Sequence, residues 1–334
     1  MAKTIAIYAL SNALNLEDCC QNAKFWGVNT LILSPDLLND PDNFELVKSY
    51  GLKIWLNVSI FNAPEYLKRK PEHFAISNKG HIAKTSWCQF VCPSQSGYID
   101  KLVSDLKSWL EADQVSYISL DFLRHYLFWQ DQPYELINAD DIEYGCFCNL
   151  CLNRFIQETE QNIAITDVTS ETQVKLQYQA WRIELITQTA KKLYNEIKTI
   201  APKSEIILNT MPWKYDEFNS ALEKFGGQKL DTLANYFDAI CPIAFSHITP
   251  QEASEKAALM EYYHSISDKK IYYGLQVDHW RLKFDIPNNQ FETELKRNIV
   301  EAKDGMVIYN YKHLVENEEK ARILKRHLNP EIHF

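Results

Sequence analysis

The sequence lacks any long apolar run. None of its hydrophobic stretches approaches the roughly 18 residues that a membrane-spanning helix needs, so we expect no membrane segment. Only a short apolar run precedes Ser11 and Asn12 at the N-terminus, which is too short for a signal peptide and predicts a first strand. We therefore expect a cytoplasmic protein.

Positive charge is scarce as well. The chain holds 35 Lys and Arg against 44 Asp and Glu, a formal net charge of −9. Proteins that bind nucleic acid need a basic surface to displace counterions from phosphates, so we expect no nucleic-acid partner. Glycine-rich phosphate loops, serine-centred nucleophile elbows and histidine-rich catalytic metal motifs are also missing from the sequence.

Glycine is rare, with 9 in 334 residues, and no Pro- or Ser-rich linker divides the chain. The composition is 46% hydrophobic, so the chain can bury a large core. Because α/β barrels reach this length as one domain, we predict a single catalytic domain over residues 1–334.

Eight short apolar runs recur along the chain, and helical patterns with apolar residues three and four apart lie between them. The runs are residues 4–10, 29–34, 52–59, 116–121, 205–210, 237–245, 270–277 and 305–309. The helical segments include residues 16–26, 43–50, 97–110, 173–200, 250–267 and 291–303. Eightfold strand–helix alternation predicts an α/β fold, a single (β/α)8 TIM barrel.

Strand parity places polar residues inside the barrel, near the ends of the strands. If Ile54, Leu56 and Val58 face the helices, Asn57 faces inward, because successive side chains alternate. The same argument points Asp121 inward from the fourth strand, and Gln276 and Asp278 from the seventh. Barrel enzymes carry their sites at this C-terminal end.

Two long loops, after strands 3 and 4, interrupt the alternation at the same end. Residues 60–95 carry Trp87, Cys88 and Cys92, and residues 122–170 carry Trp129 and the run Cys-Phe-Cys-Asn-Leu-Cys at 146–151. Loops this long in a compact domain are usually functional or specifically stabilised.

The cysteines of these loops suit one metal ion. Cys146, Cys148 and Cys151, with Cys92 or Cys88, supply the four thiolates that a closed structural zinc site prefers. A disulfide or scattered buried thiols are the alternatives, and the absence of a secretion signal argues against oxidation.

The two cysteine segments resemble the zinc-binding stretches of family 42 β-galactosidases. They read Val-Cys-Pro-Ser-Gln-Ser-Gly-Tyr at 91–98 and Cys-Phe-Cys-Asn-Leu-Cys-Leu-Asn-Arg-Phe at 146–155. The resemblance implies a glycosidase barrel in which Cys92, Cys146, Cys148 and Cys151 hold a structural zinc. Cys88 has no counterpart in it.

The catalytic residues of that family have no match here. Its acid is a Glu in an Asn-Glu pair closing strand 4 and its nucleophile a Glu on strand 7, whereas this chain has Asp121 and Asp278 at these places. Other features resemble a broader set of glycosidase-like barrels: Asp121-x-x-Arg124 on strand 4, a Pro-x-x-x-x-His pattern at 242–247, and Gly-Leu-Gln at 274–276. They imply a carbohydrate-active barrel.

Two carboxyl groups usually cleave a glycosidic bond. Asp121 is the first candidate, although a salt bridge to Arg124 would give it a structural role instead. Asp278 is the second. The remaining candidates rank below it, as surface-loop residues or by distance from Asp121 in sequence: Asp216, Glu217 and Glu143.

Aromatic faces and polar rims bind sugars in such pockets. The tryptophans expected at the mouth are Trp213, Trp280, Trp87 and Trp129, each with a packing role as the alternative. Polar candidates for binding substrate are Tyr8, Asn57, Arg124, His247 and Gln276. We predict a glycoside hydrolase acting on a small or oligomeric sugar, with a carbohydrate-binding pseudoenzyme as the alternative.

Overall fold

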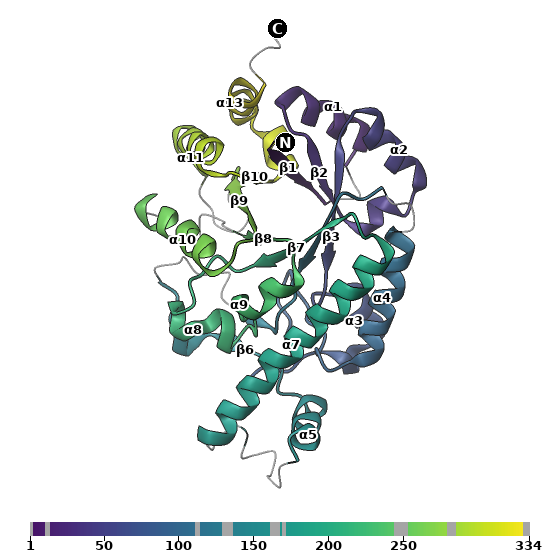
Figure 1. Ribbon diagram of the computed structural model, residues 1–334, viewed down its shortest axis with the longest axis vertical. Helices are drawn as coiled ribbons and strands as arrows, with labels where there is room; N and C mark the ends of the chain where they lie inside the picture. The colour runs from purple at the N-terminus through teal and green to yellow at the C-terminus, as the bar shows by residue number, and fades with distance from the viewer. Residues whose placement is uncertain are drawn as a thin grey trace.

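Eight parallel strands close into a barrel in the order β1-β10-β9-β8-β7-β4-β3-β2 (Figure 1). The computed structural model describes residues 3–10, 14–110, 114–128, 136–160, 168, 172–243, 253–278 and 285–329. The strands are β1 Thr4–Ala9, β2 Thr30–Leu33, β3 Lys53–Ser59, β4 Tyr117–Asp121, β7 Glu205–Thr210, β8 Ala239–Pro242, β9 Lys270–Gln276 and β10 Gly305–Tyr309. They match the eight predicted runs, so the predicted (β/α)8 barrel is confirmed.

Helices surround this barrel on the outside (Figure 1). Those between or after the strands are α1 Leu16–Trp26, α2 Pro41–Ser49, α4 Ser96–Leu110, α7 Thr172–Ile200, α8 Glu217–Lys224, α9 Leu230–Leu233, α10 Ala253–Ile266, α11 Asn288–Glu301, α12 Tyr311–Glu316 and α13 Glu318–Leu328. Within the described part of the chain, no helix has the length and apolar character needed to cross a membrane. The cytoplasmic location and the absence of a nucleic-acid partner stay predictions.

Local sequence explains where these helices begin and end, as α1 shows. The side chain of Asn15 accepts hydrogen bonds from the free backbone N–H groups of Glu17 and Asp18 at its start. Gly27 ends the helix with a φ of 84°, a left-handed conformation that glycine adopts without steric cost.

The barrel interior has two layers. An aromatic layer fills the N-terminal part, where the ring of Trp55 lies 5.5 Å from Tyr117 and 5.1 Å from Tyr272. Two residues further along the same strands, the inward positions hold Asn57, Ser119 and Gly274, because strand residues alternate between faces. Ile54, Leu56 and Val58 pack in the outer core, as the parity argument predicted. The barrel is therefore plugged at one end and polar at the other.

The two long loops interlock beside this polar end. The loop after β3 contains α3 Pro64–Arg69, and the loop after β4 contains the antiparallel pair β5 Leu127–Phe128 and β6 Glu143–Tyr144, followed by α5 Asn149–Glu158. Ser77 of the first loop bridges Gly145 of the second, and the Phe147 backbone N–H donates to the Ile76 carbonyl at 2.7 Å. Main-chain pairing thus brings the separate cysteine segments together.

Candidate active site and metal centre

Asp121 ends β4 with its carboxylate at the polar end of the barrel. Its Oδ1 accepts a hydrogen bond from the Phe122 backbone N–H at 2.9 Å, and its Oδ2 accepts one from Asn57 Nδ2 at 3.4 Å. Phe122 has a φ of 51°, an uncommon conformation for a bulky residue. The chain therefore turns sharply immediately after the carboxylate.

Asn57 is the centre of the hydrogen-bond network around Asp121. Its Oδ1 accepts from Ser119 Oγ at 2.6 Å and from Asn209 Nδ2 at 3.2 Å. Asn209 Nδ2 also lies 3.3 Å from the Tyr8 hydroxyl. Because two donors occupy the Asn57 amide oxygen, its amino group is left to face Asp121. Residues from four strands thus hold the carboxylate in place.

Burial dominates the electrostatics of Asp121. It raises the pKa of the carboxyl group, whereas the hydrogen bonds from Asn57 and Phe122 and the charge of Arg124 oppose the increase. A raised pKa favours the protonated form, since desolvation penalises the charged one. Asp121 is consequently suited to donate a proton.

Arg124 points into the loop after β4. Its Nη1 donates to the carbonyls of His125 at 3.1 Å and Leu127 at 3.4 Å, and its guanidinium lies over the rings of Phe90 and Phe122. The side chain is 4% exposed, and burial lowers its pKa to about 10. These contacts give Arg124 a role in shaping the loop, and its predicted contact with substrate stays a prediction.

Asp278 lies just beyond the end of β9, where it meets a buried lysine. Its Oδ2 is 3.6 Å from Lys320 Nζ of α13, and its Oδ1 accepts from the Ile286 backbone N–H at 3.0 Å. Lys320 also donates to the Val277 carbonyl at 2.8 Å. Gln276 is buried and donates to the Asp278 carbonyl at 2.9 Å, which ties the end of the strand together.

The other carboxylate candidates have different partners. Glu143 lies 3.1 Å from His81 Nδ1, across the interlocked loops. Glu217 accepts from the Lys214 backbone N–H at 2.6 Å, at the start of α8. Neither residue directly follows the end of a barrel strand, and both stay ranked below Asp278.

The aromatic candidates lie in different settings. Trp87 is partly buried, with its ring 6.0 Å from Phe122, and its sugar-stacking role stays a prediction. Trp213 is fully buried, with its ring 4.8 Å from Phe218. It offers no open face for stacking in this conformation, so a stacking role would require the loop to open. Trp129, His247 and Trp280 lie outside the described residues, and their proposed roles stay predictions.

Four cysteines meet where the two loops interlock. The sulfur atoms of Cys92, Cys146, Cys148 and Cys151 all lie within 4.8 Å of one another. Cys92 Sγ is 3.4 Å from Cys148 Sγ and 3.3 Å from Cys151 Sγ. Zinc–sulfur bonds of about 2.3 Å place the corners of a tetrahedron about 3.8 Å apart, so this donor set fits one tetrahedral metal ion after a small expansion.

The surroundings of the cluster also suit thiolate ligands. The backbone N–H groups of Ile76 and Cys148 donate to Cys146 Sγ at 3.4 and 3.5 Å. Hydrogen bonds with the neighbouring cysteines raise the pKa of Cys92 and lower that of Cys148. Cys88 is instead 3.1 Å from Thr85 Oγ1 and lies outside the cluster, in agreement with the resemblance.

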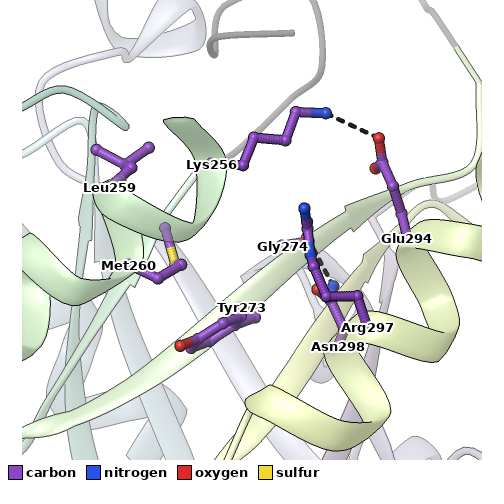
Figure 2. Close-up of a pocket in the computed structure, with 8 residues that line it drawn as sticks. All are labelled: Lys256, Leu259, Met260, Tyr273, Gly274, Glu294, Arg297 and Asn298. Atoms are coloured by element: carbon purple, nitrogen blue, oxygen red, sulfur yellow. Dashed lines mark hydrogen bonds and ion pairs between the residues drawn. The ribbon is translucent and has the colours of Figure 1, made fainter. Parts of the chain in front are cut away.

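Figure 2 shows a different pocket, on the outside of the barrel between α10 and α11. Lys256 and Glu294 form an ion pair of 2.8 Å across it, and Asn298 Nδ2 donates to the Gly274 carbonyl at 3.1 Å. Its volume of about 20 Å³ holds little more than one water molecule. This pocket is therefore too small for a sugar.

Comparison with known proteins identifies the fold. No family model and no curated protein matches the chain. Among solved structures, the beta-galactosidase from the psychrophilic Marinomonas ef1 is similar with a TM-score of 0.71 at 10% identity, over 97% of this chain and 59% of that one. A GH42 beta-galactosidase from G. stearothermophilus gives 0.67 at 13% identity, over 98% and 57%.

The similarity in fold also includes a shorter solved structure. The PgaB (BpsB) glycoside hydrolase domain from Bordetella bronchiseptica gives a TM-score of 0.67 at 11% identity, over 99% of this chain and all of that one. The chain thus spans less than two thirds of the two galactosidases but the full length of this domain. At these identities the likeness shows the fold alone. The expected likeness to family 42 barrels is confirmed in the fold, and the four-cysteine cluster agrees with it.

The sequence reasoning missed Asn209, the donor that joins β7 to the Asp121 network. Its signal was present, because Ile207 lies in the barrel interior and the parity of β7 therefore points Asn209 inward. Ser119 shares the inward parity of Asp121 on β4, but its bond to Asn57 depends on the register between β3 and β4.

Because Trp213 is fully buried, replacing it with Ala should destabilise the fold. We expect a loss of about 3–5 kcal/mol in the free energy of unfolding, as for other buried tryptophans, measured by urea denaturation. Tyr215→Ala in the same loop is the control: Tyr215 is 65% exposed, and we expect a change within about 0.5 kcal/mol. Weakened sugar binding with unchanged stability would instead assign Trp213 to a stacking platform.

Proposed function

We propose that this chain is a glycoside hydrolase in which Asp121 is the general acid. The observation that carries the proposal is a carboxyl group with a raised pKa at the C-terminal mouth of a barrel, oriented by Asn57. Proton donation to a glycosidic oxygen needs a carboxyl group that stays protonated at higher pH than an ordinary aspartate does. The shared barrel fold of the galactosidases and the PgaB domain supports this choice of reaction.

Asp278 is the proposed second carboxylate. Its neighbour Lys320 supplies a positive charge, which suits a group that must act as an anion, either as nucleophile or as base for water. Asp121 would donate its proton to the leaving oxygen as the glycosidic C–O bond breaks, and the anomeric carbon would form its new bond to Asp278 or to water. A carboxyl separation of about 5 Å would mean retention, and one of about 6.5–9.5 Å inversion.

A sugar-binding barrel without turnover is the second candidate. It is favoured by the contacts of Asp278, because Lys320 and the Ile286 backbone N–H already engage both carboxylate oxygens. In that case Asp278 holds the barrel end to α13, and the ligand binds without reacting. Sugar binding with no turnover by concentrated protein would support this candidate.

Asp121→Asn should reduce turnover of a suitable aryl glycoside by roughly 100-fold or more, the usual effect of removing a general acid. Sugar binding should persist, because the side chain keeps its size. Steady-state kinetics on substrates found in a glycoside screen measure the effect. Normal turnover by a folded Asp121→Asn protein refutes the assignment.

Asp278→Asn separates the two roles of that residue. A catalytic carboxylate predicts a similar loss of turnover, and azide should restore reaction if Asp278 is a nucleophile. A purely structural role predicts a less stable protein that keeps its turnover.

The stability of the protein should depend on pH through Asp121. Because the folded-state pKa is raised, the stabilising contribution of Asp121 is complete below its unfolded-state pKa and is lost as pH rises through the folded-state value. Asp121→Asn does not titrate. The stability of the variant relative to the wild type should therefore increase from acidic to neutral pH in urea denaturation. A difference that shrinks over this range contradicts the raised pKa.

We propose further that the four-cysteine cluster holds a structural zinc ion. Cys92, Cys146, Cys148 and Cys151 would complete a tetrahedron and leave no open position for substrate or water. The metal would supply mechanical support by joining the loops after β3 and β4, and it would take no part in bond cleavage.

Purified protein should contain one zinc per chain, and Cys148→Ser should lose it and unfold at a lower temperature. Cys88→Ser is the matched control, since Cys88 is buried in the same loop region but lies outside the cluster. Elemental analysis and thiol titration measure both. Well under one zinc per chain, with all four thiols freely titratable in folded wild-type protein, contradicts the site.

A further inference from the structure

We propose that Arg182 of α7 is the positive counter-charge of the metal centre and a positioning residue for its ligand Cys146. The inference rests on the proposed zinc site. Helix α7 contributes no ligand to the site, but through Arg182 it would contribute to the affinity for the metal.

Arg182 is almost completely buried next to the cysteine loop. Its side chain is 1% exposed, and its Nη2 donates to the Gly145 carbonyl at 2.6 Å. Gly145 immediately precedes the ligand Cys146. One helical turn earlier, the Tyr178 hydroxyl donates to the Cys146 carbonyl at 2.6 Å. Tyr178 and Arg182 are four residues apart and so share one face of α7, from which they hold the carbonyl groups on both sides of the Cys146 Cα.

The same guanidinium joins the loop to another part of the barrel wall. Its Nη1 and Nη2 donate to the carbonyls of Lys224 at 3.1 Å and Phe225 at 2.7 Å, where α8 ends. The rings of Tyr144 and Phe147 flank it, with centroids 5.2 and 5.6 Å away. This enclosure excludes water, so the positive charge of Arg182 needs compensation inside the protein.

No carboxylate provides that compensation among the residues that the structure describes. The three acceptors of Arg182 described above are backbone carbonyls, and its Nε is buried without a hydrogen-bond partner among the described residues. Burial lowers the pKa of Arg182, and the nearby groups Tyr178, Tyr144, Cys146 and Cys151 act in the opposite direction. Of these groups, cysteines lose their protons when they bind a metal, so the metal-bound cluster would be the source of negative charge near Arg182.

Zinc with four thiolates carries a net charge of −2, and it too is enclosed. A buried charge is costly unless an opposite charge lies near. Arg182 and the metal centre thus each reduce the cost of burying the other. Groups around a metal's ligands typically change its affinity 10- to 100-fold when they are mutated, which sets the expected size of the effect.

Two substitutions at Arg182 separate charge from shape. Arg182→Gln removes the positive charge and keeps a hydrogen-bond donor, and Arg182→Lys keeps the charge but loses the forked geometry. Arg154→Gln is the matched control, because Arg154 on α5 is near the same loop but partly exposed and paired with Glu158 at 2.5 Å. All variants are refolded in excess zinc, since bound metal stabilises the folded state.

The readout is zinc affinity, measured by competition with a chromogenic chelator, with far-ultraviolet circular dichroism as a check of folding. We expect Arg182→Gln to weaken zinc binding by about 10- to 100-fold, Arg182→Lys to stay within a few-fold of wild type, and Arg154→Gln to be unchanged. Wild-type affinity in folded Arg182→Gln overturns the proposal.

The Lys variant keeps the test decisive if the Gln variant does not fold. A folded Arg182→Lys protein that loses zinc as readily as a cysteine variant shows that geometry, not charge, sets the affinity, and this overturns the assignment of Arg182 as the counter-charge. If the wild-type protein binds no zinc at all, the proposed metal site itself is refuted, whatever the role of Arg182.

Discussion

The closure of β1 against β10 is the constraint on which the polar end of the barrel depends. Thr4 pairs with Gly305, whose φ is 152°, and a Cβ atom at Gly305 would overlap the Thr4 carbonyl. Only glycine allows this approach. Once the barrel is closed, alternate residues of every strand must face inward, and Asp121, Asn57 and Asn209 meet although each lies on a different strand.

The two interior layers then determine the chemistry available at Asp121. Trp55, Tyr117 and Tyr272 fill the barrel below, so they shield the carboxylate from water on that side. The hydrogen bond from Asn57 only partly offsets the desolvation, and the pKa of Asp121 remains raised. A core selected for stability alone would not bury a carboxyl group there. A buried group that lowers the stability of the fold is typical of a functional site.

The periodicity of the sequence predicted the features that depend on a single strand, which are its position in the chain and the face on which each side chain lies. It gave all eight strands, and it placed Asn57, Asp121 and Gln276 on the inner face correctly, because side chains alternate with a period of two. It could not give the Asn57–Asn209 contact or the Lys320–Asp278 ion pair, which depend on register and on a helix far along the chain. Trp213 is buried by the packing of its loop, and a loop has no repeating sequence pattern from which this burial could be predicted.

The metal centre and the candidate acid are joined by a continuous set of contacts. Arg182 holds Gly145 through its side chain, and its backbone carbonyl lies 3.0 Å from His125 Nε2. His125 is fully buried, and its own N–H donates to the Gly226 carbonyl at 2.8 Å. It stands only four residues after Asp121. A metal ion that ordered the cysteine loop would therefore also restrain the turn that follows β4, and through this turn it would affect the orientation of the carboxyl group at the mouth.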